Sequence, residues 1–223
     1  PDYMIDMVIS EAIKKVCPEM TLGCIQAQVK VENSRNYLWE EINSYCDGLK
    51  NQLPIEELAS LPRIKDGREV YKKLGKMPSK YRLSSEALIR RVLQGKGVYK
   101  INNIVDINNL ISLKSKFPVG SYNIKNLHSP ISLVIGEAGQ QYKGIGKEFV
   151  NIENLPVLAD SMGCFGSPTS DSERAMITDK AKEIVMCIFS FSGKTEVGEY
   201  LHYAKDLLAR NANGQDMETK IVG

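Results

Sequence analysis

The sequence predicts a mixed α/β (α+β) protein, a single domain in which a central β-sheet is flanked by helices. Three observations favour this fold class. Apolar residues recur at helical spacing in the first half of the chain, short strand-like segments separated by glycines follow Gly120, and a continuous apolar run near residue 187 is typical of an inner strand. The 223 residues are 43% hydrophobic and 25% charged, so the chain can bury roughly 70% of the surface that its unfolded form exposes.

The N-terminal part is predicted to hold one strand followed by one long helix. In Cys24–Val31 polar and apolar residues alternate, which is typical of a half-buried strand. Asn33 or Ser34 can cap the helix that follows, because both side chains can accept a hydrogen bond from a free backbone N–H group. Apolar residues recur every three or four positions up to about Gly48, where we expect this helix to end.

Four further helical segments are predicted before residue 120. Pro54 opens a short helical turn, and residues 66–75 (DGREVYKKLG) form a basic helix. A stronger amphipathic helix (SSEALIRRVLQG) begins at Ser84 or Ser85 and is closed by a glycine. Asp106 is predicted to cap the next helix, whose apolar stripe faces the core.

Beyond Gly120 the pattern changes to short strands and turns. Ile131–Ile135 and Pro156–Asp160 are predicted strands, with glycine-rich loops between them. Glu183–Phe191 is the best candidate for a central strand, because residues 184–189 are apolar without interruption and rich in β-branched residues. A final amphipathic helix begins at Thr195 and frays into a polar C-terminal tail.

Composition excludes several classes of protein. No segment approaches the ~20 consecutive apolar residues that a bilayer span requires, and the first residues lack the basic start and apolar stretch of an export signal. The five cysteines are widely spaced and form no CxxC pair, so we expect neither a disulfide framework nor a structural metal site. We therefore expect a cytoplasmic protein with no membrane contact, no metal and no cofactor.

Positive charge is concentrated in one segment. Residues 63–100 carry 12 Lys or Arg and 3 Asp or Glu, whereas the whole chain has a net charge of only +2. Such a segment can attract an anionic partner, nucleic acid first among the candidates, or it can be a solvated face with no partner. The candidate nucleic-acid-binding residues in it are Lys72, Lys73, Lys76, Lys80, Arg82, Arg90 and Arg91.

Familiar nucleotide and nucleophile motifs are incomplete. SGKT (Ser192–Thr195) follows a strand and precedes a helix, but Ile188 stands where a phosphate-binding loop needs its first glycine. The richest polar cluster is Ser167–Thr178, which lies in a loop before the central strand and follows Asp160. Its carboxylates and hydroxyls could hold a water and a polar substrate, and the alternative is a capped turn leading into a strand.

Two long stretches and the strand and helix after them resemble a known family. They are RLSSEALIRRVLQGKGVYKINNIVDINNLISLKSKFPVGSYNI (Arg82–Ile124) and VLADSMGCFGSPTSDSERAMIT (Val157–Thr178). The sequence is similar to the B3/B4 domain, the tRNA-editing region in the beta chain of phenylalanine–tRNA ligase, and especially to free-standing relatives of that domain. The resemblance implies an N-terminal extension (1–60) packed on the same domain, a B3/B4-like domain (61–211) and a flexible C-terminal tail (212–223).

The resemblance also implies a function, the hydrolysis of amino acids wrongly esterified to tRNA. The implied partners are the acceptor end of a tRNA, on the basic segment, and an aminoacyl group or similar ligand in a pocket. We expect Asp160 or Asp171 to orient the attacking water. The residues expected to bind the substrate are Asn103, Gly120, Ser172, Arg174 and Thr178.

Two departures from the ligase pattern leave other functions open. Gly120 stands where the ligase has a histidine, and Cys187 lies in the strand where the ligase has a glutamate. Loss of a ring at position 120 is expected to open space for a substrate side chain. The same losses favour an alternative, a module that binds tRNA or an amino-acid-like molecule without catalysis, and a small-molecule enzyme on the same scaffold is a third. The sequence does not predict an oligomeric state.

Overall fold

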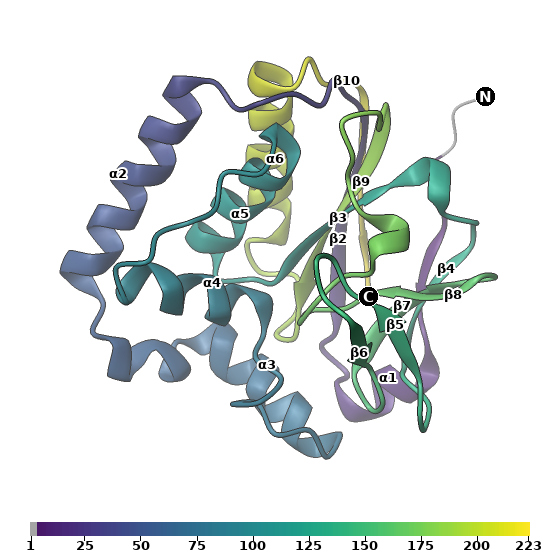
Figure 1. Ribbon diagram of the computed structural model, residues 1–223. Helices are drawn as coiled ribbons and strands as arrows, with labels where there is room; N and C mark the ends of the chain where they lie inside the picture. Colours follow the sequence, from purple (N-terminus) through teal and green to yellow (C-terminus); the bar gives the residue numbers. More distant parts are fainter. Residues whose placement is uncertain (1–3) are drawn as a thin grey trace.

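The computed structural model describes residues 4–223, and within them the chain forms three layers (Figure 1). Helices cover one face of a four-stranded sheet, and a second four-stranded sheet covers its other face. The first sheet has the order β10 (Gln215–Val222), β2 (Thr21–Gln28), β9 (Glu183–Ser190) and β3 (Val119–Asn123). The second has the order β1 (Met7–Ile9), β4 (Ile131–Ile135), β7 (Pro156–Asp160) and β8 (Gly163–Gly166). Strands β5 (Gln141–Lys143) and β6 (Phe149–Asn151) form a separate hairpin.

Five helices form the layer on the first sheet, and short helices connect the strands elsewhere. The layer consists of α2 (Asn36–Gln52), α3 (Pro62–Lys73), α4 (Ser84–Leu93), α5 (Asn103–Ser115) and α6 (Val197–Asn211), and Figure 1 shows them together on one side. The remaining helical segments are α1 (Glu11–Val16), η1 (Ile55–Ser60), η2 (Ile124–Asn126) and η3 (Glu173–Ala175). The mixed α/β single-domain prediction is confirmed.

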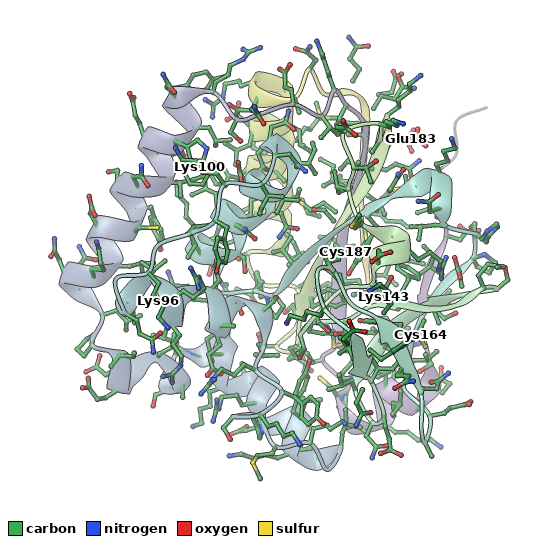
Figure 2. All side chains as sticks on the ribbon, in the orientation of Figure 1. Lys96, Lys100, Lys143, Cys164, Glu183 and Cys187 are labelled. Carbon is green, nitrogen blue, oxygen red and sulfur yellow. The ribbon has the colours of Figure 1, made fainter. Side chains whose placement is uncertain are left out.

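Strand β9 lies between two hydrophobic cores, which explains its uninterrupted apolar sequence. Ile184 and Met186 face the core under the helices, whereas Val185 and Cys187 face the core between the two sheets. Cys187 therefore lies in the interior (Figure 2), with its Sγ 3.9 Å from Sγ of Cys24 on β2. The prediction of a central strand at this place is confirmed.

Strand β2 is also covered on both faces, so the prediction of a half-buried strand is wrong. Ile25 contributes to the core under the helices and Leu22 to the core between the sheets. The strand begins at Thr21, three residues earlier than predicted, and pairs with β9 along its whole length. The alternation of polar and apolar residues misled the prediction because Cys24, scored with the polar face, is buried as an apolar side chain.

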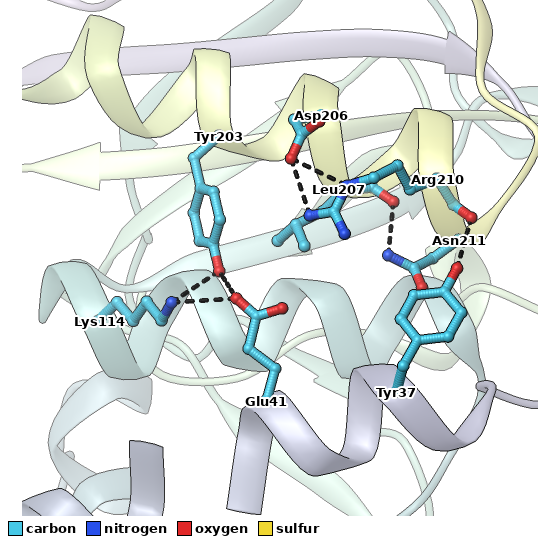
Figure 3. Close-up of polar contacts among 8 residues, drawn as sticks. All are labelled: Tyr37, Glu41, Lys114, Tyr203, Asp206, Leu207, Arg210 and Asn211. Carbon is cyan, nitrogen blue, oxygen red and sulfur yellow. Dashed lines mark hydrogen bonds and ion pairs between the residues drawn. The ribbon is translucent and has the colours of Figure 1, made fainter. Parts of the chain in front are cut away.

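Helix α2 runs four residues past Gly48 and is fixed to α5 and α6 by polar contacts (Figure 3). Lys114 of α5 donates hydrogen bonds to Glu41 Oε1 (3.1 Å) and to the hydroxyl of Tyr203 (2.8 Å), which itself donates to Glu41. Burial opposes the charged form of Glu41, but the bonds from Tyr203 and Lys114 hold its pKa below the usual value. Tyr37, near the start of α2, donates to the backbone oxygen of Arg210 at 2.7 Å.

Helix α5 begins three residues before Asp106, so Asp106 is not its cap. Asn102 is the N-cap and accepts a hydrogen bond from Val105 N at 2.9 Å. Asp106 instead accepts from Ile101 N (3.1 Å) and from Ser34 Oγ (2.5 Å). Its carboxylate thereby ties the segment before α2 to the start of α5.

The C-terminal residues form a strand, so the predicted flexible tail at 212–223 is wrong. Strand β10 pairs antiparallel with β2, from Gln215 opposite Gln28 to Val222 opposite Leu22. Strand β10 is ordered by backbone hydrogen bonds to a strand about 190 residues earlier in the chain. The local sequence carries no sign of that pairing. Residues 1–60, predicted as an extension packed on the domain, supply the inner strand β2 of the same sheet.

Candidate functional site

A cavity of about 220 Å³ opens between α4, α5, the start of β3 and the loop before Asp171. These walls come from three separate parts of the chain, and they lie together because α4 packs on α5 and β3 follows α5 directly. The cavity is smaller than the roughly 300–1,000 Å³ of pockets for drug-sized ligands. Its lining residues are Ser84, Ala87, Leu88, Arg91, Asn108, Asn109, Ser112, Val119 and Thr169.

The α5 wall is polar although α5 is buried on nearly every side. Asn108 donates from Nδ2 to Val119 O (3.0 Å) and accepts from Ser121 Oγ (2.6 Å), and Ser112 Oγ donates to Phe117 O (2.8 Å). These bonds hold both side chains and the start of β3 in place. Buried polar groups are costly unless they are bonded, so their presence here supports a rigid wall.

Asn109 is the polar group of this wall that remains available. Its side chain is partly exposed, and within residues 4–223 its amide nitrogen donates to no acceptor. Its Oδ1 lies 3.4 Å from Nδ2 of Asn108, at the long end for a hydrogen bond. Asn109 can therefore donate two hydrogen bonds to a ligand in the cavity.

The opposite wall is formed by the N-terminal part of α4. The backbone N–H of Ser84 donates to Pro168 O at 2.7 Å, which fixes the helix start to the loop that carries Thr169. Thr169 Oγ1 lies 2.7 Å from the hydroxyl of the buried Tyr71, and Ser167 Oγ accepts from the N–H groups of Thr169 and Ser170. The loop is thereby held from both ends.

Arg91, one of the predicted nucleic-acid-binding residues, contributes the only charge of the cavity lining. Its guanidinium carbon lies 4.2 Å from the ring centroid of Tyr99, and its Nε donates to Gly97 O at 3.3 Å. The described lining contains no carboxylate and no imidazole. The cavity therefore suits a ligand that offers hydrogen-bond acceptors or negative charge, such as an ester carbonyl or a sugar hydroxyl.

Asp160, predicted to orient water, and Arg174, predicted to bind substrate, lie outside this lining and are bonded to each other. Arg174 donates to both carboxylate oxygens of Asp160 at 2.8 and 3.0 Å, and also to the backbone oxygens of Asn126 and Gly163. The N–H groups of His128 and Met162 complete the shell of the buried Asp160 side chain. Burial raises the pKa of this carboxyl, but the bonds from Arg174 and the two backbone groups outweigh it and hold the pKa below its usual value.

Asp171 accepts a hydrogen bond from the phenol of Tyr122 at 2.7 Å. Burial raises the pKa of the Asp171 carboxyl to about 7, against the opposing effect of that bond. The ring of Tyr122 lies against Gly120 and Gly166, where a Cβ on either glycine would collide with it. The prediction that Gly120 opens space for a substrate side chain is therefore wrong: the phenol of Tyr122 fills that space.

The other predicted substrate-binding residues are dispersed. Asn103 is fully buried and donates to Lys30 O (2.8 Å) and Asn211 O (3.0 Å), so it joins α5 to the segment after β2 and to the end of α6. Ser172 is buried, and its Oγ has no hydrogen-bond partner among the described residues. Thr178 Oγ1 accepts from Lys180 N in the turn before β9. None of the three lines the cavity.

The predicted basic surface is also divided. Lys72, Lys73 and Lys80 are exposed on and after α3. Lys76 is buried, with its ammonium 4.1 Å from the ring centroid of Tyr81. Arg82 pairs with the fully buried Glu86 (3.5 Å), which Arg68 also contacts at 2.8 Å, and Arg90 is partly buried.

Two larger hollows of about 340 Å³ lie beside Lys114, one against α2 and one against the start of α3. Their charged groups are already engaged: Glu41 pairs with Lys114, Arg63 pairs with Glu196, and Lys116 donates to the hydroxyl of Tyr45. The smaller cavity is the better candidate, because it combines an unpartnered amide with a cation.

Comparison with known proteins places this geometry in a family. The family model for the B3/4 domain matches residues 66–219, which include the whole cavity. The chain belongs to the B3/4-domain family. The match agrees with the family resemblance inferred from the motifs.

Among solved structures, this B3/4 chain is similar to an N-terminal fragment of the phenylalanyl-tRNA synthetase beta subunit from Pyrococcus horikoshii. The two share 14% sequence identity with a TM-score of 0.49, over 100% of this chain and 53% of that one. The B3/4 chain thus spans about half the length of that fragment. No curated protein matches.

Among the described residues, no helix is both long and apolar enough to cross a bilayer. No group of three or more His, Cys, Asp or Glu side chains within residues 4–223 is arranged to hold a metal ion.

Sequence reasoning missed most of the cavity lining. Asn109 belongs to the motif that carries the resemblance, but it was not among the expected site residues. One signal was available: Asn108 and Ser112 are polar residues four positions apart among the apolar residues of this helix, a spacing that places them on one face. Thr169 had no such signal, because its place beside α4 depends on the contact between Ser84 and Pro168.

Proposed function

We propose that this B3/4 domain binds the aminoacylated 3′ end of a tRNA in the α4–α5 cavity and hydrolyses the ester. One observation carries the proposal: the family-matched region contains a small cavity lined by the free Asn109 amide and by the Arg91 guanidinium, which keeps N–H donors beyond its bonds to Gly97 O and Lys96 O. A cavity of about 220 Å³ is suited to an amino-acid side chain rather than to a whole nucleotide.

The reaction needs little beyond positioning, because an aminoacyl ester is much easier to hydrolyse than an amide. A water oxygen attacks the ester carbonyl carbon, the bond from that carbon to the ribose oxygen breaks, and a proton passes to the ribose oxygen. The products are a free amino acid and an intact tRNA. Asn109 would stabilise the negative charge that develops on the carbonyl oxygen, and the neighbouring ribose hydroxyl would help to orient the water.

In this proposal Asp160 is a positioning residue in place of its predicted role with water. Its oxygens accept four hydrogen bonds, two from Arg174 and one each from His128 N and Met162 N, so a water has little access to it. Asp171, the other residue predicted to orient the water, accepts a hydrogen bond from the phenol of Tyr122 and lies outside the cavity lining. Its loop also carries Thr169 of the cavity wall.

A second function is favoured by a specific observation, namely that the described lining holds no carboxylate or imidazole. Such a cavity could bind an aminoacyl-tRNA end, or a similar small molecule, without turning it over. Both functions require the Asn109 donors, but only hydrolysis requires release of the amino acid.

The test is deacylation of a panel of correctly charged and mischarged tRNAs, compared with the spontaneous rate. We expect accelerated release from one or a few substrates, reduced by about 10²-fold in Asn109→Ala because one donor to the developing oxyanion is lost. Asn43→Ala, at an exposed position on α2, is the matched control. A flat panel with folded protein in excess refutes hydrolysis, and retained binding in that case supports the second function.

A further inference from the structure

The loop between α4 and α5 presents an aromatic ring to solvent at the edge of the cavity. In residues 94–102 (QGKGVYKIN) Tyr99 is 64% exposed and Ile101 is 54% exposed. The loop contains Lys96 and Lys100 and no acidic residue. Single exposed apolar side chains are ordinary on protein surfaces, so a binding role for Tyr99 depends on what surrounds its ring.

Tyr99 is held in place rather than loose. The Arg91 guanidinium lies 4.2 Å from the centroid of its ring, and Nε of Arg91 donates to Gly97 O at 3.3 Å, so one residue fixes both the ring and its loop. Two residues after Tyr99, the backbone N–H of Ile101 donates to Asp106 Oδ1 at 3.1 Å and fixes the end of the loop. Arg91 covers part of the ring, and most of the residue's surface remains open.

Arg91 also connects this ring to the cavity. The same side chain lines the cavity with Asn109 and contacts Tyr99 outside it. A group stacked on the open face of Tyr99 would therefore be separated from a group bound in the cavity by the ring and the Arg91 side chain.

Two further cations belong to the loop that carries the ring. Lys96 and Lys100 lie on the same loop (Figure 2), and the Lys100 ammonium is 5.1 Å from the ring centroid of Trp39 on α2. Aromatic rings alternating with cations and free of carboxylates are typical of surfaces that bind single-stranded nucleic acid, where bases stack on the rings and phosphates meet the cations. A protein partner would instead favour a contiguous apolar patch, and here Lys100 separates Tyr99 from Ile101.

We propose that Tyr99, backed by Arg91, is a stacking platform for an unpaired base at the 3′ end of an RNA whose terminal ribose enters the α4–α5 cavity. This inference rests on the proposed function, and it assigns a base-binding subsite to a loop that the predicted site did not include. Stacking tolerates any base, so the platform contributes affinity and position rather than sequence specificity.

The test uses an uncharged, fluorescently labelled single-stranded RNA that ends in CCA, with binding followed by anisotropy. We expect Tyr99→Ala to weaken binding about 10-fold and Tyr99→Phe to bind like the wild type, since the phenyl ring still stacks. The matched control is Phe149→Ala on the β5–β6 hairpin, which removes a ring of similar exposure (63%) away from the cavity and should have no effect.

A second RNA with an abasic site in place of the last base identifies stacking. The wild type should bind it more weakly than the intact RNA, and Tyr99→Ala should add little further loss. The platform is overturned if Tyr99→Ala weakens binding of both RNAs equally, or if Tyr99→Ala binds the intact RNA like the wild type. It is also overturned if the wild type binds no RNA, and that result would leave the loop to a protein partner.

The two proposals fail separately. If Tyr99-dependent binding of the intact RNA accompanies a flat deacylation panel, the platform stands and hydrolysis is refuted. If the wild type deacylates tRNA, and Tyr99→Ala changes neither the KM of deacylation nor the affinity for RNA, the platform is refuted and hydrolysis stands.

Discussion

Among the described residues, the Asp160 carboxylate accepts two hydrogen bonds from side chains, and Arg174 donates both. Replacing Arg174 with alanine removes these two bonds. The Asp160 side chain is fully buried, so the substitution leaves an uncompensated charge inside the protein. Breaking a buried ion pair in this way costs about 3–5 kcal/mol of unfolding free energy. The N–H groups of His128 and Met162 still reach the carboxylate, so we expect the lower end, about 3 kcal/mol.

The assay is urea unfolding followed by circular dichroism. With a slope of about 3 kcal/mol/M for a chain of this size, a loss of about 3 kcal/mol lowers the midpoint by about 1 M. Arg210→Ala is the matched control, because its ion pair with Asp206 is exposed on both sides and should be worth under about 0.5 kcal/mol.

The pH dependence of the loss is a further check. The pKa of Asp160 is depressed in the folded protein, so its stabilising contribution is present above about pH 4 and is lost as the pH falls through the folded pKa. In Arg174→Ala the carboxyl can protonate and shed the unpaired charge, so the difference from the wild type should shrink in acid. A loss below about 0.5 kcal/mol at pH 7, together with loss of deacylation in the folded variant, would refute the bracing role and favour the predicted role of Arg174 with the substrate.

Two further predictions concern stability. Gly120→Ala should lower the unfolding free energy by about 1–3 kcal/mol, because a Cβ there collides with the buried ring of Tyr122. Gly48→Ala should raise the unfolding free energy by about 0.5–1 kcal/mol, because Gly48 is inside α2 and no atom lies near its Cβ position. Thermal unfolding that ranks the two variants the other way would contradict the packing argument. For Asp171, the folded pKa of about 7 lies above the usual 3.8, so its contribution favours folding at low pH and is lost as the pH rises from about 4 to 7. Asp171→Asn should flatten the fall in stability over that interval, and an unchanged slope in denaturant unfolding from pH 4 to pH 8 would contradict the burial of this carboxyl.

Several elements could be predicted because their signals are local. Residues 184–189 are apolar on both faces of the strand, so this segment is predicted as an inner strand whichever strands pair with it. The helix that begins at Ser84 was predicted from its periodicity and its closing glycine. Its buried face was not fully predicted, because Glu86 enters the interior with Arg68 and Arg82, and charged residues are normally assigned to the outside.

Site residues were harder to predict, because their roles depend on partners far away in the chain. Asp160 and Arg174 were expected at a substrate, yet they are bonded to each other across 14 residues. Gly120 was expected to leave space, yet Tyr122, two residues further along the same strand, occupies it. Polar residue types indicate chemistry, but only the arrangement of neighbours shows whether a group is free.

The sequence by itself determined the family, through motifs in 82–124 and 157–178, and it determined the mixed α/β class, because hydrophobic periodicity is set within single helices and strands. Tertiary structure alone decided that residues 215–222 complete the first sheet and that Asn109, Arg91 and Thr169 line one cavity. Those outcomes depend on contacts between segments tens to nearly two hundred residues apart, whose free energy comes from burial and pairing that no local pattern encodes.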